Sequence, residues 1–242
     1  MHTISQARKA ISIVLKLIVT VCAAAGTVMS AYAGRNSFMG GSKVFMYFTI
    51  QSNIAIALIS LIGCALLMRD QAIGNGWLIV KLAGTVSITL TGAVFAALLA
   101  PILGERAWSV PNTLTHLIVP LTAVADFFVV VSGAEIKRRN VIYVIILPLL
   151  YAVYAGIGYV KGWEFAKGQT YPYFFLNWGS PAGAFGFTDK LPYMGCVWWM
   201  VALLLFLITI GWCYLAIADK LGKNRQKNVC PAEEYKDERK GC

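Results

Sequence analysis

Twenty consecutive residues without a charged side chain run from 141 to 160: VIYVIILPLLYAVYAGIGYV. A run of this length provides the roughly 20 residues that an α-helix needs to cross about 30 Å of hydrocarbon. Lipid offers no hydrogen-bond partners, so such a run must satisfy its own backbone N–H and C=O groups, as a helix does. The stretch therefore predicts a membrane-spanning helix.

Five further apolar runs lie elsewhere in the chain. The six predicted spans are residues 10–33, 44–68, 77–100, 113–132, 141–160 and 195–218. Of the 242 residues, 58% are hydrophobic and 13% are charged, with a mean hydropathy of +0.67. A soluble domain carries about 25% charged residues. The alternating pattern of barrel strands is absent. The sequence thus predicts an all-α, polytopic membrane protein, with one six-helix domain over 1–218 and a charged, disordered tail over 219–242.

Positive charges are distributed unevenly across this arrangement. Fifteen of the 21 Lys and Arg residues fall on the side that holds both termini. Because cytoplasmic loops carry an excess of Lys and Arg, we expect both termini in the cytoplasm and the protein in the plasma membrane. The net charge of +10 is then a signal of topology, and no nucleic-acid partner is expected. Residues 31–33 have the small-x-small form of a signal-peptidase site, but the preceding run is longer than a usual signal core, so we expect the first span to be retained.

His116 lies in the fourth apolar run, in the stretch LTHLIVP (114–120), and the other histidine of the chain is His2. An imidazole in hydrocarbon is costly unless it has a partner or a function. The start of a helix and an apolar surrounding both favour the neutral imidazole, which can accept a proton as a general base must. The alternative is a histidine that only packs between helices.

A second polar cluster, YFTIQSN (47–53), opens the second run. Thr49 and Asn53 are one turn apart and share a helix face, and Gln51 lies between them in sequence. The structural alternative is a threonine bonded to its own helix and an asparagine that links helices. Alternate spans start on the same side of a membrane, so this cluster and His116 are predicted at the same end of the bundle.

The depths of the two clusters also match. If Ser42 and Asn112 cap the two helices, Thr49 and His116 differ in depth by only about 5 Å. A hydroxyl activated by a histidine is the minimum for acyl transfer. We therefore predict Thr49 as nucleophile and His116 as base, with Asn53 or Asn112 orienting the base or binding the oxyanion.

The longest outer loop, 161–194, contains the aromatic stretch TYPYFFLNW (170–178). Such a stretch suits the membrane–water interface. We expect it to fold back over the outer helix ends, with Tyr171, Tyr173 and Asn177 lining or covering a pocket.

Asp126 is the other costly residue of the fourth span. It lies ten residues after His116, about 15 Å deeper, so on a straight helix it is no direct partner of the imidazole. We expect a hydrogen-bonded carboxyl that organises the interior. Lys81 is expected to extend toward the cytoplasmic edge and not to pair with Asp126.

At these residues the chain resembles the family of androgen-induced and androgen-dependent membrane proteins. Phe48-Thr49 is similar to the family's threonine segment, and His116 followed by Pro120 and Asp126 is similar to its histidine segment. Tyr171-Pro172 with the following aromatics resembles its late Tyr-Pro segment. The animal members are threonine hydrolases of fatty acid esters of hydroxy fatty acids, so the resemblance implies a lipid ester hydrolase. The spacing from histidine to proline is one residue shorter here, and Gln51-Ser52-Asn53 departs from the animal pattern, which bears on the substrate more than on the fold.

The sequence thus favours an intramembrane hydrolase of lipid esters, with a membrane lipid as substrate. No cofactor and no metal site is predicted, because the six cysteines lack metal-ligand spacing and no glycine-rich phosphate loop is present. Two alternatives stay open: a small proton-coupled transporter using His116 and Asp126, and a membrane scaffold without catalytic activity.

Overall fold

The computed structural model describes residues 5–33, 41–71, 73–131 and 136–229. These residues form helices and loops without a strand. Six helical stretches are long and apolar enough to span a membrane, and each coincides with one predicted span. They are Gln6–Ala33, Phe48–Met68, Asn75–Arg106, Val110–Val130, Arg138–Val160 and Cys196–Asn224. The prediction of an all-helical fold is confirmed for the described residues, which include six helices long and apolar enough to cross a membrane.

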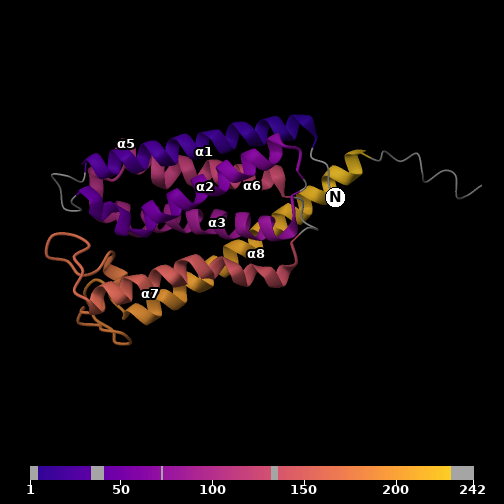
Figure 1. Ribbon diagram of the computed structural model, residues 1–242. Coiled ribbons are helices and arrows are strands. Elements are labelled where there is room, and N and C mark those ends of the chain that lie inside the picture. Colours follow the sequence, from indigo (N-terminus) through magenta and orange to yellow (C-terminus); the bar gives the residue numbers. More distant parts are fainter. Residues whose placement is uncertain (1–4, 34–40, 72, 132–135, 230–242) are drawn as a thin grey trace, which may run out of the picture.

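The helices form two groups (Figure 1). The main elements are α1 (Gln6–Ala33), α2 (Phe48–Met68), α3 (Asn75–Val94), α6 (Val119–Val130), α7 (Ile146–Val160) and α8 (Cys196–Val229). One apolar core joins α1, α2, α3 and α6, with Val19 and Ile88 fully buried in it. A second core joins α3 and α6 to α8, with Val86 and Leu207 fully buried. Because α3 and α6 contribute to both cores, they hold the α7–α8 pair against the four-helix group.

The short elements gather mainly at the helix ends. They are η2 (Gly41–Met46), η3 (Phe95–Leu99), α4 (Ala100–Leu103), η4 (Gly104–Arg106), α5 (Val110–Thr113), η5 (Leu114–Ile118), η7 (Arg138–Ile145) and η8 (Phe174–Leu176). The start of α1 and the end of α8 lie at one end of the bundle, and the loop 161–194 lies at the other (Figure 1). We call the latter the loop end. The first turn of α2 also lies there, as do α5 and η5.

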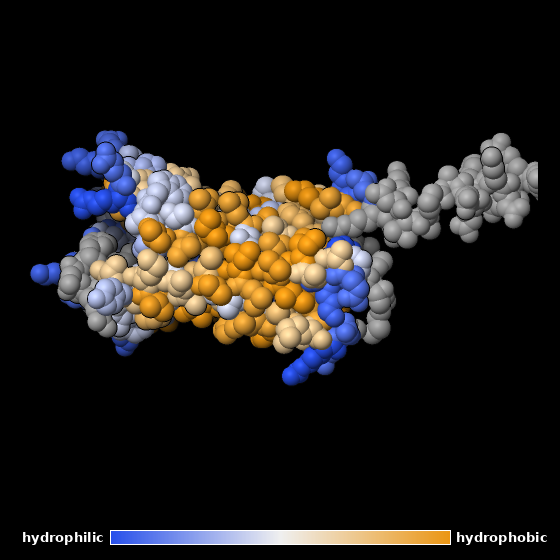
Figure 2. All heavy atoms as spheres, turned by 90° about the horizontal axis from the view of Figure 1, so that it is seen from above, coloured by the Kyte–Doolittle hydropathy of each residue, from blue (hydrophilic) through white to orange (hydrophobic). Residues whose placement is uncertain are grey.

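The surface of the molecule is hydrophobic over its middle part. Figure 2 shows hydrophobic residues in a band across the middle of the molecule, with hydrophilic residues concentrated toward both ends. Large apolar side chains such as Val21, Val28 and Leu150 are more than half exposed within the spans. Exposed apolar side chains on helices of this length are what a bilayer requires, and six such helices suggest an integral membrane protein.

Three helix boundaries differ from the prediction. Ser42 does not cap the second span, because 41–46 form the 3₁₀-helix η2 and α2 starts after Tyr47. The fourth span starts after Ser109 rather than at Asn112. The predicted disordered tail is helical over 219–229, as part of α8, and residues 230–242 lie outside the described residues. Lys, Arg, Gln and Leu are good helix formers and extend an existing helix without a new nucleation cost.

Candidate active site

Thr49 and His116 lie together at the loop end. The Thr49 Oγ1 is 3.3 Å from the His116 Nε2, and both side chains are partly buried. Thr49 comes from the first turn of α2 and His116 from the middle of η5. Spans 2 and 4 thus bring the hydroxyl and the imidazole within hydrogen-bond reach.

The other ring nitrogen sets the tautomer of His116. The Nδ1 is 3.1 Å from the backbone oxygen of Asn112 and 3.0 Å from the Oγ1 of Thr115. Thr115 Oγ1 itself donates to the carbonyl of Pro111. Because a carbonyl oxygen only accepts, Nδ1 carries the hydrogen and Nε2 is left as an acceptor facing Thr49. Asn112 contacts the ring through its backbone oxygen, whereas its side-chain amide donates to the Ala107 carbonyl.

A buried aromatic ring fixes one face of the imidazole. Phe95, which is 2% exposed, stacks on His116 with the ring centroids 3.9 Å apart and the planes 22° apart. Trp108 in turn meets Phe95 edge to face at 5.2 Å. Sequence reasoning missed both residues, because a phenylalanine inside an apolar run carries no signal that distinguishes it from other core positions.

Two prolines explain the irregular helices around the imidazole. Both η3 and η5 are π-helices, and each is centred four residues before a proline, Pro101 and Pro120. A proline has no N–H for the carbonyl four positions earlier, and its ring crowds that carbonyl. The preceding N–H therefore bonds one residue further back, from Val119 to the Leu114 oxygen. Such widened turns are frequent at functional sites. The second of them holds His116.

Asn53 ties the two parts of the site together. Its fully buried side-chain amide donates to the Thr49 oxygen at 2.7 Å and to the Thr115 oxygen at 3.2 Å. It therefore links α2 to η5 through backbone atoms beside both reactive residues, and its NH₂ is already committed to these carbonyls. Gln51 is not brought to the pair, since its amide donates to the Phe45 carbonyl.

The loop 161–194 contributes Tyr173. Its phenol oxygen accepts a hydrogen bond from the Thr49 N–H at 3.3 Å and lies 3.4 Å from the Thr49 Oγ1. The ring stacks on Phe175 at 5.0 Å and meets Tyr47 edge to face at 5.7 Å, so its position is fixed. Burial raises the pKa of the Tyr173 phenol above its usual value, so the group stays protonated and able to donate.

The other loop residues proposed from the sequence have different surroundings. Asn177 accepts a hydrogen bond from the Gly179 N–H within its own turn. Tyr171 is partly buried, and it is not among the residues that line the pocket described next. Of the three loop residues, Tyr173 is therefore the one that meets the threonine.

A largely apolar pocket starts beside Thr49 and lies between the two helix groups. It encloses about 680 Å³ of empty space, counting the part that is open to the surroundings. The lining residues that carry a hydroxyl are Thr49, Thr91, Tyr151 and Tyr173. The apolar lining comes from α3, α7, α8 and η8, for example from Leu90, Ala152, Leu176 and Leu207. Such a pocket accommodates a hydrocarbon group and places it next to the threonine.

The start of α2 adds hydrogen-bond donors. Tyr47 caps the helix without a side-chain hydrogen bond. The first N–H groups of a helix have no partner within the helix, so those of Phe48 and Thr49 point out of its end. The Thr49 N–H donates to the Tyr173 phenol oxygen, so the start of α2 and the phenol meet beside the Thr49 hydroxyl.

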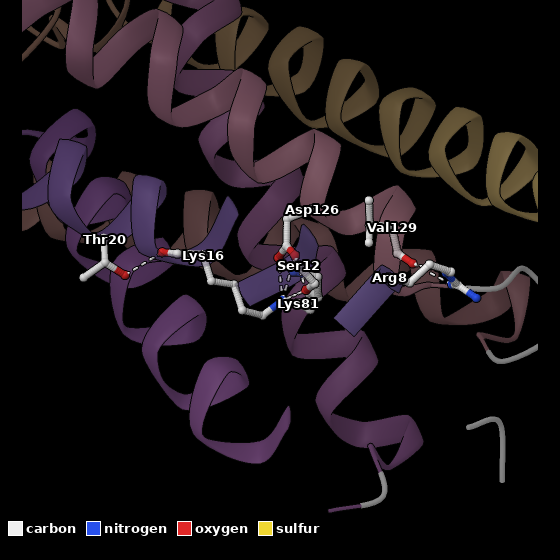
Figure 3. Close-up of polar contacts among 7 residues, drawn as sticks. All are labelled: Arg8, Ser12, Lys16, Thr20, Lys81, Asp126 and Val129. Atoms are coloured by element: carbon white, nitrogen blue, oxygen red, sulfur yellow. Dashed lines mark hydrogen bonds and ion pairs between the residues drawn. The ribbon is translucent and has the colours of Figure 1, made fainter. Parts of the chain in front are cut away.

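Asp126 belongs to a separate, deeper cluster (Figure 3). Its carboxylate accepts hydrogen bonds from Ser12 at 2.6 Å and from Lys16 at 2.7 and 2.8 Å, and it also ion-pairs with Lys81. All four residues are at most 3% exposed. The predictions that Lys81 extends to the edge and does not pair with Asp126 are therefore wrong. A buried ammonium is costly, and a carboxylate within reach on α6 offsets part of that cost. The carboxyl is hydrogen-bonded and joins α1, α3 and α6.

No group of three or more potential metal ligands occurs among the described residues, and Cys22, Cys64, Cys196 and Cys213 are free thiols. Compared with protein-family models, with curated proteins and with solved structures, the chain matches none. The case for a function therefore rests on the geometry of Thr49, His116 and Tyr173 beside the apolar pocket.

Proposed function

We propose that this protein is an intramembrane hydrolase of lipid esters, with Thr49 as nucleophile and His116 as general base. The observation that carries the proposal is the 3.3 Å contact between the Thr49 Oγ1 and the His116 Nε2, beside an apolar pocket that Thr49 lines. Packing alone does not explain why a hydroxyl and an imidazole lie there, because apolar side chains would pack in a membrane without the cost of a buried polar group. The same residues carry the resemblance to the threonine hydrolases named above.

The first half of the reaction forms an acyl-threonine. The Thr49 oxygen attacks the ester carbonyl carbon while its proton passes to the His116 Nε2. The Asn112 carbonyl keeps the Nδ1 hydrogen in place and stabilises the imidazolium that forms. When the tetrahedral intermediate collapses, the bond between carbon and the alcohol oxygen breaks, and the Nε2 proton goes to that oxygen.

The oxyanion of the intermediate needs a donor, and the phenol of Tyr173 lies 3.4 Å from the Thr49 Oγ1. A donor held in place before the reaction typically supplies the largest single part of the stabilisation in acyl transfer. We assign this role to Tyr173 rather than to Asn53 or Asn112, whose amides donate to backbone carbonyls.

The second half releases the acid. A water molecule attacks the acyl-threonine carbonyl and gives its proton to the His116 Nε2, and the proton then returns to the Thr49 oxygen as the fatty acid leaves. The products are a fatty acid and an alcohol, with the enzyme regenerated. The loop end places this chemistry near the surface of the bilayer, where water reaches it. From the distribution of Lys and Arg we place that end on the extracytoplasmic side of the plasma membrane.

Labelling with a fluorophosphonate probe tests the nucleophile and its base. The wild-type protein in detergent micelles should be labelled, and Thr49→Ala and His116→Ala should lose the label. Thr113→Ala is a matched control, because Thr113 lies three residues before His116 and donates to the Trp108 carbonyl. Equal labelling of all four proteins rules out the pair.

The transporter alternative receives less support. A proton relay from His116 to Asp126 needs a connection between them, whereas the contacts found for Asp126 go to Ser12, Lys16 and Lys81 on α1 and α3. Turnover of a panel of lipid esters by purified wild-type protein separates the hydrolase from a scaffold without activity.

A further inference from the structure

The pocket beside Thr49 runs inward from the loop end, parallel to the helices. Along α8, its lining extends from Met200 to Leu207, a rise of about 10 Å. Along α3 and η3 it extends from Leu99 back to Leu90, and along α7 from Ala152 back to Pro148. Since α8 runs inward while α3 and α7 run outward, all three helices place the far end of the pocket at the same, deeper level.

The deeper end of the pocket is closed on the α3 and α8 side and open on the α7 side. Leu207 is fully buried and Leu90 is 6% exposed, so these side chains form a floor. Leu149 also lines the pocket, yet it is 44% exposed on the outer surface of α7. A hydrocarbon chain can therefore enter sideways from the bilayer and extend to the floor.

The two reactive residues are placed differently relative to the pocket. Thr49 and Tyr173 line it, whereas His116 does not. In acyl transfer the histidine delivers its proton to the oxygen of the leaving alcohol, so that oxygen must lie next to Nε2. The alcohol part of an ester then lies on the His116 side of Thr49, and the acyl part points into the pocket.

We propose that this pocket binds the acyl chain of the substrate, with the alcohol part outside it, and that Leu207 at its floor limits the acyl length. The inference rests on the proposed hydrolase function for its catalytic consequence. It goes further by assigning the acyl and alcohol parts of the ester to opposite sides of Thr49. It also names Leu207 as the residue that limits the length of the acyl part.

Two variants at the floor should move the chain-length preference in opposite directions. Leu207→Trp fills the floor and should favour short acyl chains, whereas Leu207→Ala enlarges it and should favour long ones. A pocket discriminates a single methylene by about tenfold or more, so the ratio of kcat/KM for p-nitrophenyl palmitate and butyrate should change on at least that scale. Leu205→Trp is the matched control, because Leu205 is 60% exposed on the same helix.

A second substrate series tests the assignment of the arms. In butyrate esters of ethanol, decanol and hexadecanol, the length varies only in the alcohol, and the Leu207 variants should leave this profile unchanged. A shift in the alcohol series, or an unchanged acyl series in variants that still hydrolyse p-nitrophenyl butyrate, would overturn the proposal while leaving the hydrolase intact.

Photo-crosslinking examines the pocket without any turnover. A fatty acid with a diazirine at its methyl end, added to Thr49→Ala protein, should label the α8 peptide that contains Leu207 or the α3 peptide that contains Leu90. The label should disappear with an added Leu207→Trp change and persist with Leu205→Trp. Such labelling, together with a wild-type protein that cleaves no ester, would refute the hydrolase but keep the pocket assignment. Labelling confined to other peptides would refute the assignment.

Discussion

The backbone oxygen of His116 lies so close to Gly92 that a Cβ at that glycine would be 2.7 Å from it. The contact exists because Pro120 offers this carbonyl no N–H, so the carbonyl is left out of the helix and turned toward α3. The ring of Pro120 would lie 3.3 Å from the same Cβ. The lack of a side chain at Gly92 thus allows η5, which carries His116, to approach α3 closely.

Gly92→Ala should push η5 away from α3 and separate His116 from Thr49. Extra atoms in a packed contact cost about 1–3 kcal/mol, and misplacement of a reactive group by about 1 Å lowers rates by about 100-fold. We expect kcat for p-nitrophenyl butyrate to fall by that order. Gly76→Ala is the control, because nothing lies within 4 Å of a Cβ at this position of α3. Similar kcat values for the two variants would contradict the role of the close contact.

Tyr173→Phe removes the phenol but keeps the ring that stacks on Phe175. If the hydroxyl stabilises the oxyanion, kcat should fall by about 10²–10³-fold with little change in KM, as for the loss of other such donors. Tyr193→Phe serves as the control, since Tyr193 is 57% exposed in the same loop. A change in KM alone would show that Tyr173 only contacts the substrate.

Asn53→Leu keeps a side chain of similar size but leaves the Thr49 and Thr115 carbonyls without their shared donor. Buried groups without partners cost about 1–3 kcal/mol each, so the midpoint of thermal unfolding in detergent should fall and fluorophosphonate labelling should slow. Gln51→Leu, two residues earlier, removes only the partly exposed bond to the Phe45 carbonyl and should change neither measurement. Equal effects of the two changes would argue against a linking role for Asn53.

Asp126→Asn leaves Lys16 and Lys81 buried without their carboxylate. Breaking a buried pair by removing one partner costs about 3–5 kcal/mol, so the free energy of unfolding in detergent should fall by that amount. Asp70→Asn is the control, because it removes the ion pair between Asp70 and Lys9, in which the Asp70 side chain is 77% exposed. Exposed pairs contribute at most about 1 kcal/mol to the free energy of unfolding. Folded Asp126→Asn protein should still react with the fluorophosphonate, because the cluster lies apart from Thr49. Loss of labelling in folded protein would instead link the cluster to the active site.

Much of this architecture follows from local composition. Six apolar runs without alternation require six helices in lipid, wherever those helices lie relative to one another. The end of the bundle that holds Thr49 and His116 follows from the count of spans between them. Thr49 and His116 are recognised as candidate functional residues because a polar group is costly in hydrocarbon. That cost depends only on the residue and on the apolar segment that contains it.

The remaining features depend on which helix faces meet. Phe95 stacks on His116, and Lys81 pairs with Asp126, because α3 lies against α6, a relation that no periodicity within either segment specifies. His116 contacts the backbone of Asn112 and not its side chain, and Thr49 contacts Tyr173 and not Tyr171. Both outcomes depend on differences of a few ångströms in how the elements pack. Apolar burial is non-directional, so the sequence by itself determined that the helices exist and which end is polar. The tertiary packing of side chains decided which of those polar groups touch.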